Sequence, residues 1–385
     1  MFLLAFGLRY CYNEGKRGGI GVTRQDRNSS LILGLAHFLV DFACTALLTG
    51  ASGSLLYWQV IACAVLYNGL AFAFQLPVGA LGDCLKLHRG LAAVGCGLVA
   101  VGGFLPQPLA VCAVIGLGNA CFHVGGGREA LKRGGEKASQ VGRFVAPGAI
   151  GIFLGPRLAG IGWLGKGLLP LYLLAAAVML LLTRKEGGEA EKKEIRAIPM
   201  GKGRKAAVCA CMFLTVLLRS YMGTVLQYPI LSDFGWAFVY TLCIFGGKYF
   251  GGILADRFGT VRFCAAAQVV GTVLFVLSVR LPVLAMPAIF LFNTTMAVTA
   301  SRLYACVPRF PGAMFGLTTF ALYLGVLPRL LGFRAELFTP WGLGLLSLGS
   351  GVLLVAGLIL SEGGGKHGNG DCKIAGAVAG ADTSD

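Results

Sequence analysis

Two ionisable side chains lie inside the first long apolar segment of the chain. The stretch "LAHFLVDFAC" places His37 and Asp41 four residues apart within the apolar run 31–50. Residues at i and i+4 share one face of a helix, so these two side chains would lie side by side. A carboxylate in lipid is costly unless it is paired or hydrated, and an unpaired one binds a proton instead. The pair could therefore bind and release a proton inside a membrane.

The composition indicates the kind of protein that contains this pair. Of the 385 residues, 56% are hydrophobic and 13% are charged, and the mean hydropathy is +0.76. This is more apolar surface than a soluble core can bury, which indicates an integral membrane protein. The net charge of +16 does not indicate nucleic-acid binding, because the basic residues lie between the apolar runs. We therefore expect a lipid bilayer, and no nucleic acid, as partner.

Twelve apolar runs follow one another along the chain, and most are close to the ~20 residues that cross a bilayer as a helix. Helices are the expected form, because lipid offers no hydrogen-bond partner to a backbone polar group. The runs are 31–50, 56–80, 90–105, 108–127, 141–162, 164–183, 206–229, 235–255, 261–280, 282–304, 312–333 and 340–361. They predict an all-α membrane protein with twelve transmembrane helices.

The basic residues predict the orientation of these helices. With both termini in the cytoplasm, the inner segments hold 25 of the 33 Lys and Arg residues and the outer loops hold four. Such an excess of positive charge is typical of cytoplasmic loops. We therefore expect a multi-pass protein of the cell (plasma) membrane with both ends inside.

One long charged stretch divides the apolar runs into six and six. We predict a cytoplasmic N-terminal tail at 1–29, an N-terminal six-helix half at 30–183, a cytoplasmic linker at 184–205, a C-terminal six-helix half at 206–361 and a disordered cytoplasmic tail at 362–385. Two such halves are typical of duplicated transporters, whose binding site lies near mid-membrane where the halves meet. Two unrelated membrane domains are the alternative.

A short loop motif recurs at equivalent places in the two halves. It reads "GALGDCLKLHRG" after the second run and "GGILADRFGTVRF" after the eighth, and its main residues are Gly79, Asp83, Gly252, Asp256, Arg257 and Gly259. The motif resembles that of the major facilitator superfamily, Gly-x-x-x-Asp-Arg-x-Gly. The resemblance implies that fold and a conformational latch, in which the aspartate accepts from a helix N-terminus or pairs with a basic side chain. The first copy has Cys84 and Lys86 where the motif has arginine and glycine.

The fifth run contains a second motif, "GIFLGPRLAG", with Gly151, Gly155, Pro156 and Gly160. It is similar to the glycine-proline motif in the fifth helix of proton-coupled antiporters of that superfamily. Proline bends a helix, and glycines four residues apart let a partner helix approach. A kinked packing helix in any membrane protein is the alternative.

The first and fourth runs resemble the fosmidomycin-resistance branch of the superfamily, through "HFLVDF" and "GLGNACFHVGGGREAL". The resemblance implies that helices 1, 4, 7 and 10 line a central cavity. Their polar residues are His37, Asp41, Asn119, His123, Arg219 and Asn293. We expect Asp41 to carry the coupled proton with His37 as its partner, and the other four to bind substrate. The alternative is structural: a permanent ion pair between Asp41 and Arg219, with His37 bonded to a backbone carbonyl.

These motifs predict a secondary active transporter. The first hypothesis is export of small anionic or drug-like compounds by proton antiport, driven by the proton gradient and without a cofactor, in a monomer. A proton-coupled uptake symporter for a nutrient anion is the second, and a membrane sensor or scaffold that does not transport is the third. We expect no enzyme, because the sequence has no nucleophile-base set and no phosphate loop. We also expect no metal site, because the 13 cysteines lack paired ligand spacing.

Overall fold

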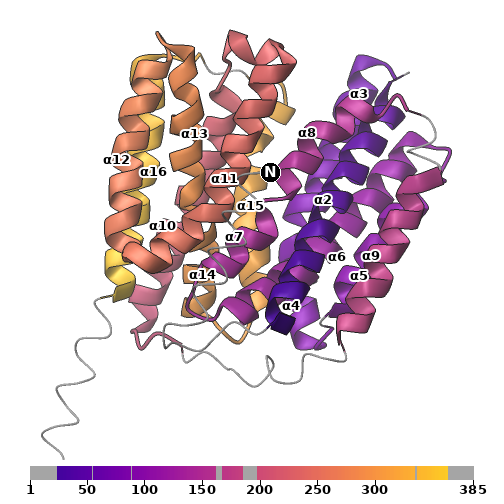
Figure 1. Ribbon diagram of the computed structural model, residues 1–385, viewed down its shortest axis with the longest axis horizontal. Helices are drawn as coiled ribbons and strands as arrows, with labels where there is room; N and C mark the ends of the chain where they lie inside the picture. The colour runs from indigo at the N-terminus through magenta and orange to yellow at the C-terminus, as the bar shows by residue number, and fades with distance from the viewer. Residues whose placement is uncertain are drawn as a thin grey trace, which may run out of the picture.

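The computed structural model describes residues 24–53, 55–87, 89–161, 167–184, 197–333 and 336–362, and the regular elements in these ranges are all helical. The first six apolar runs form one group of helices, drawn in indigo to magenta in Figure 1. These helices are α2 (Arg24–Ser52), α3 (Tyr57–Asn68), α4 (Gln75–Cys84), α5 (Arg89–Gly102), α6 (Pro108–Gly134), α7 (Ser139–Val145), α8 (Gly148–Leu158) and α9 (Leu169–Arg184).

The last six apolar runs form a second group beside the first, drawn in red to yellow. It consists of α10 (Lys202–Val225), α11 (Phe234–Phe258), α12 (Thr260–Ser278), α13 (Ala285–Thr294), α14 (Met296–Cys306), α15 (Pro311–Leu330) and α16 (Pro340–Glu362). The two groups meet mainly through α4 against α15 and α7 against α11. Figure 1 shows α7 where they meet.

The described helices account for the twelve predicted spans. Nine are long and apolar enough to cross a membrane, when α3 with α4 and α13 with α14 are each counted as one. Two shorter apolar helices, Gly90–Gly102 and Leu169–Leu181, are further spans. The fifth run forms the remaining one as two helices, α7 and α8. The prediction of an all-α membrane protein is thus confirmed.

Several predicted spans are interrupted. A π-helical turn, Gly69–Ala73, separates α3 from α4, and the tenth run breaks at Thr295 between α13 and α14. The fifth run breaks at Ala146 and Pro147. Proline has no backbone N–H to donate, so Pro147 removes one bond from the helical ladder. Hydropathy does not detect such breaks, because the residues around them stay apolar.

The ends of some helices differ from the predicted boundaries. The N-terminal tail was expected to end at 29, but α2 already begins at Arg24; α10 likewise begins at Lys202, inside the predicted linker. Helices continue past the apolar run because basic side chains reach the membrane surface while the backbone stays hydrogen-bonded. The rest of the predicted tails, 1–23 and 363–385, and linker residues 185–196 lie outside the described residues.

Glycine residues allow the helices of each half to approach closely. On α5, a Cβ added to Gly95 would overlap the backbone of Phe122 and would lie 2.6 Å from the carbonyl oxygen of Gly118 on α6. Helix association in lipid relies on such close packing, because lipid tails are as apolar as the side chains. Two residues further along α5, a Cβ on Gly97 would meet no atom within 4 Å.

The two glycines on α5 provide a matched pair of substitutions. Gly95→Ala should destabilise the protein by about 1–3 kcal/mol, because the added methyl group overlaps backbone that cannot move aside freely. Gly97→Ala should be neutral or slightly stabilising, since alanine is the better helix former. The midpoint of thermal unfolding in detergent measures both variants, and equal midpoints would show that α5 and α6 are not closely packed here.

Candidate functional site

Three ionisable side chains of the N-terminal half form a compact cluster, which we call the proton site: His37 and Asp41 on α2, and His123 on α6. Nε2 of His37 lies 3.0 Å from Oδ2 of Asp41 and 2.9 Å from Nε2 of His123. Nε2 of His123 lies 3.5 Å from Oδ1 of Asp41. All three residues are buried, with exposed fractions of 4%, 6% and 7%. His123 thus joins the pair that the sequence placed on one helix face.

A hydrogen bond at Nδ1 fixes the tautomer of each histidine. Nδ1 of His37 donates to the carbonyl oxygen of Phe144 over 2.8 Å, and Nδ1 of His123 donates to that of Asn119 over 2.9 Å. A carbonyl can only accept, so each Nδ1 carries a hydrogen. In neutral histidines both Nε2 atoms would then be acceptors that face each other and a carboxylate. This geometry requires at least one further proton among the three groups.

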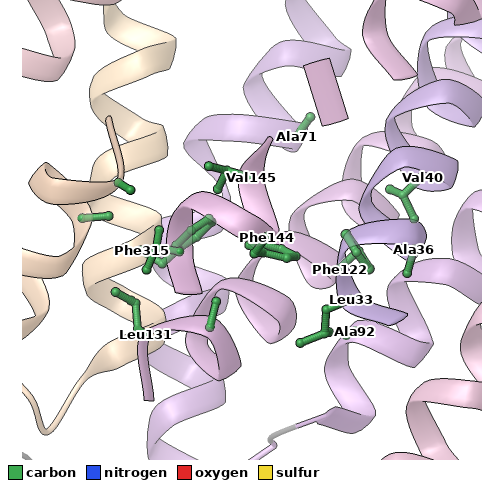
Figure 2. Packing of buried hydrophobic residues seen from close by; sticks show 14 of the residues in the cluster. Leu33, Ala36, Val40, Ala71, Ala92, Phe122, Leu131, Phe144, Val145 and Phe315 are labelled. Atoms are coloured by element: carbon green, nitrogen blue, oxygen red, sulfur yellow. The ribbon is translucent and has the colours of Figure 1, made fainter. Parts of the chain in front are cut away.

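The surrounding helices leave just enough room for the proton site. A Cβ on Gly148, the first residue of α8, would overlap Asp41 and His37. The ring of Phe144 packs 4.7 Å from the ring of His37, measured between centroids, and 6.0 Å from Phe315 of the other half. Figure 2 shows Phe144 and Phe315 close together at the contact between the halves.

Asn119 contributes an amide to the same cluster. Its Nδ2 donates to Oδ1 of Asp41 over 3.3 Å and to the sulfur of Cys44 over 3.7 Å. Its side-chain oxygen is buried and has no hydrogen-bond partner in the part of the chain that the structure describes. Asn119 therefore supports Asp41 with a donor and keeps one acceptor free.

One cationic side chain of the C-terminal half, Lys248 on α11, interacts electrostatically with Asp41. It also interacts with a second cation of that half, Arg219 on α10. Arg219 stacks on the ring of Phe292, 4.3 Å from its centroid, and hydrogen-bonds Thr295. Among the described residues, no carboxylate lies within ion-pair distance of either cation. The ion pair between Asp41 and Arg219, considered from the sequence, is therefore not formed in this conformation.

Asn293, the remaining predicted substrate residue, bonds its own helix. Its Nδ2 donates to the carbonyl oxygen of Ile289 over 2.9 Å, and its Cβ faces Gly247 of α11. It is half-buried and lies two residues before Thr295, which contacts Arg219. Its side-chain oxygen remains available to a substrate near Arg219.

The proton site also has the donor set of a metal centre. His37, Asp41 and His123 could each offer one ligand atom, and these atoms lie within 4.8 Å of one another. Two imidazoles with their outer nitrogens bonded to carbonyls are typical of transition-metal ligands. Lys248 lies close enough to act on this carboxylate, however, and its positive charge opposes a divalent cation.

The first loop motif joins the two halves. Asp83 at the end of α4 accepts from the backbone N–H of Ala313 at the start of α15 over 2.9 Å, and Nε of Arg128 on α6 lies 3.3 Å from its other oxygen. Gly79 packs against the backbone of α15 at Gly312. The motif has an arginine at the position of Cys84, and here Arg128 supplies the guanidinium from another helix. These contacts are of the kind that the motif implies, and their action as a latch stays a prediction.

The second loop motif joins the halves at the equivalent place. Asp256 near the end of α11 accepts from the backbone N–H groups of Ala138 and Ser139, 2.9 and 3.0 Å away, at the start of α7. A Cβ on Gly252 would lie 2.6 Å from the carbonyl oxygen of Ala138. Arg257 stacks near Phe258 rather than on Asp256.

The last position of the loop motif has a positive φ angle in both halves. Gly259 has φ +88°, and Lys86, which stands where the first copy would have glycine, has φ +54°. Both lie in the left-handed region that glycine adopts most readily. The chain thus adopts a positive φ after both α4 and α11, once with a residue that is less suited to it.

The glycine-proline motif of the fifth run packs against α2. A Cβ on Gly151 would lie 2.5 Å from the carbonyl oxygen of Phe38, and one on Gly155 would lie 2.6 Å from that of Phe42. Pro156 lies inside α8, whereas Gly160 follows its end and would meet no atom within 4 Å. Gly151 and Gly155 thus hold α8 against the helix that carries the proton site, and Gly160 does not take part.

Four contributors to the site were not found from the sequence: the carbonyl of Phe144, the space at Gly148, and the side chains of Lys248 and Arg128. A backbone carbonyl has no signature in residue type. Lys248 and Arg128 stand out only as basic residues in or beside apolar runs. The Pro147–Gly148 pair inside a span is the one local signal, because it predicts a break in the helix.

The fold resembles known transporters, although no protein-family model and no curated protein matches the chain. The Escherichia coli fucose:proton symporter FucP is 12% identical, with a TM-score of 0.55 over 87% of this chain and 98% of that one. FucP in an outward conformation, described as a major facilitator superfamily transporter, is 13% identical, with a TM-score of 0.56 over 87% and 98%. The human organic anion transporter MFSD10 is 15% identical, with a TM-score of 0.58 over 88% and 100%. At these identities the likeness shows the fold alone, and the chain has the major facilitator fold that its loop motifs predicted.

Proposed function

We propose that the protein is a proton-coupled secondary transporter of small anionic or drug-like compounds, which works by alternating access. The observation that carries this proposal is the proton site, His37, Asp41 and His123, whose geometry requires a proton, beside two cations that lack a carboxylate partner. The structural neighbours support secondary transport as a class: one is a proton symporter and another transports organic anions.

The coupled proton binds to Asp41 and leaves from it. A carboxylate buried among apolar helices is held either as a neutral acid or against a positive charge. His37 can supply that charge by taking the proton on Nε2, 3.0 Å from Asp41. His123 lies 2.9 Å further along, so a proton can pass between the two imidazoles. The three groups together bind one or more protons in one conformation and release them in another.

The substrate binds at Arg219 and Lys248. Both cations lie in the C-terminal half, and neither has an ion-pair partner among the described residues. An anionic group would form ion pairs with both cations, and Asn293 and Asn119 would add hydrogen bonds from their amides. A guanidinium suits a carboxylate or phosphate because it donates two parallel hydrogen bonds.

The electrostatics favour proton and anion binding together. An anion at Lys248 weakens the positive potential that keeps Asp41 ionised, so each ligand should strengthen the binding of the other. This is the arrangement of a symporter. Export by exchange, the hypothesis from the fosmidomycin-resistance resemblance and the motif on α8, requires that the substrate expel the proton. We keep exchange as the second candidate because Gly151 and Gly155 pack on α2 beside Asp41.

The sign of the proton signal distinguishes symport from exchange. Purified protein in weak buffer should take up protons when monocarboxylates, dicarboxylates or phosphate esters are added, and Asp41→Asn should abolish the signal while the anions still bind. Asp233→Asn is the matched control, because Asp233 caps the outer end of α11 by accepting from Trp236. Proton release in place of uptake would establish exchange. A proton signal in Asp41→Asn equal to that of the wild type would show that Asp41 does not carry the coupled proton.

The two cations should determine affinity for the anion. Arg219→Gln and Lys248→Gln should each weaken anion binding by about 10- to 100-fold, the loss expected for a charged hydrogen bond. Arg157→Gln is the control, since Arg157 stacks on Phe153 within α8, 3.7 Å from the ring centroid. Isothermal titration with the same anions measures all three variants. Unchanged affinity in the first two would place the substrate elsewhere.

A further inference from the structure

Helix α7 is bound at its two ends by groups from different halves. At its start, the backbone N–H groups of Ala138 and Ser139 donate to Asp256 of the C-terminal half. At its end, the carbonyl of Phe144 accepts from Nδ1 of His37, 2.8 Å away. A segment of seven residues, Ser139–Val145, thus connects a carboxylate of one half to the proton site of the other.

The packing of α7 ties it to α11 rather than to α8. Gly142 lies against the backbone carbonyl of Lys248, and Gly252 lies against that of Ala138, so the two helix backbones touch. On the other side, the break at Pro147 separates α7 from α8, which packs against α2. Helix α7 also packs on α2 and α6 of its own half. A movement between the halves would therefore act on a short helix that is held from both sides.

We infer that Asp256 is a positioning residue for the proton site, acting through α7; this rests on the proposed function. While Asp256 holds α7, the carbonyl of Phe144 keeps one proton of His37 on Nδ1 and leaves Nε2 facing Asp41. When Asp256 no longer holds the start of α7, the carbonyl of Phe144 can shift away from His37. The Nδ1 hydrogen of His37 then has no fixed acceptor, so the imidazole can adopt the other tautomer and no longer keeps Nε2 facing Asp41.

Asp83 provides the matched comparison within the same chain. It also joins the halves through a backbone N–H, that of Ala313 on α15. In the part of the chain that the structure describes, however, α15 makes no hydrogen bond to the proton site. Its Phe315 packs on the ring of Phe144, 6.0 Å between centroids, and not on the carbonyl. The two loop motifs therefore join the same halves through different elements. The second holds α7, whose carbonyl accepts from His37, whereas the first holds α15 and, through Arg128, α6, which carries His123.

Other ionisable groups around the proton site remain unchanged when Asp256 or Asp83 is replaced. They are Cys44 on α2, Tyr67 on α3, Cys96 on α5, Arg143 on α7, Arg157 on α8 and Lys248 on α11. Their contribution to proton binding is common to both variants, so a difference between the variants reports on α7.

The tautomer of His37 tests the inference directly. The chain has four histidines, so NMR of protein labelled with ¹⁵N-histidine resolves few signals, and His37→Gln identifies the one of interest. Wild type and Asp83→Ala should show the Nδ1–H tautomer. Asp256→Ala should show a mixture of the two tautomers of His37, because the carbonyl that fixes the Nδ1 hydrogen is no longer held in place.

Two results would overturn the inference. An unchanged tautomer in Asp256→Ala would show that α7 does not depend on the carboxylate, and an equal change in both variants would show that opening of the halves alone is responsible. Should either alanine variant fail to fold, the pair Asp256→Asn and Asp83→Asn replaces it. The NMR signals are read without substrate, so absence of a substrate-linked proton signal would count against the proposed function alone.

Discussion

The structure depends on how one carboxylate, Asp41, is kept inside an apolar bundle. Taking a carboxylate out of water costs several kcal/mol even after the protein relaxes, so donors must lie within hydrogen-bond distance. Here the donors are a proton on His37 or His123 and the amide of Asn119, and each imidazole is fixed from behind by a backbone carbonyl. Because these partners come from α2, α6 and α7, none of these helices can move without disturbing the carboxylate.

Much of this arrangement could be predicted from local pattern. The spacing of His37 and Asp41 places both on one helix face whatever the fold, and the loop motifs place Asp83 and Asp256 after equivalent helices. The twelve apolar runs, with the basic residues between them, sufficed for the fold class. Each of these inferences uses the geometry of a single helix or the average chemistry of a loop, which residue type and spacing determine.

The rest depends on how helices are rotated against each other, and spacing along the chain does not encode this. The positions of His123 and Asp41 in the sequence do not show that α6 turns His123 toward Asp41, 82 residues away in the chain. The carbonyl of Phe144 can bond His37 because the fifth run breaks just after it, at Ala146 and Pro147. Likewise, Arg128 completes the contact of Asp83 from a different helix, which the motif around Asp83 could not show.

The proton site and the two cations belong to different halves, which bears on the energy source of transport. A proton at Asp41 and a monoanion at Arg219 and Lys248 together add no net charge to the moving protein. Such a cycle would be electroneutral, driven by the pH difference and the substrate gradient while the membrane potential does no work on it. A dianion would carry one net negative charge, and each charge that crosses the membrane is worth about 2.3 kcal/mol per 100 mV. In the proposed symport, the valence of the anion therefore determines whether the membrane potential acts on the cycle, and an inside-negative potential would oppose inward movement of a dianion with one proton.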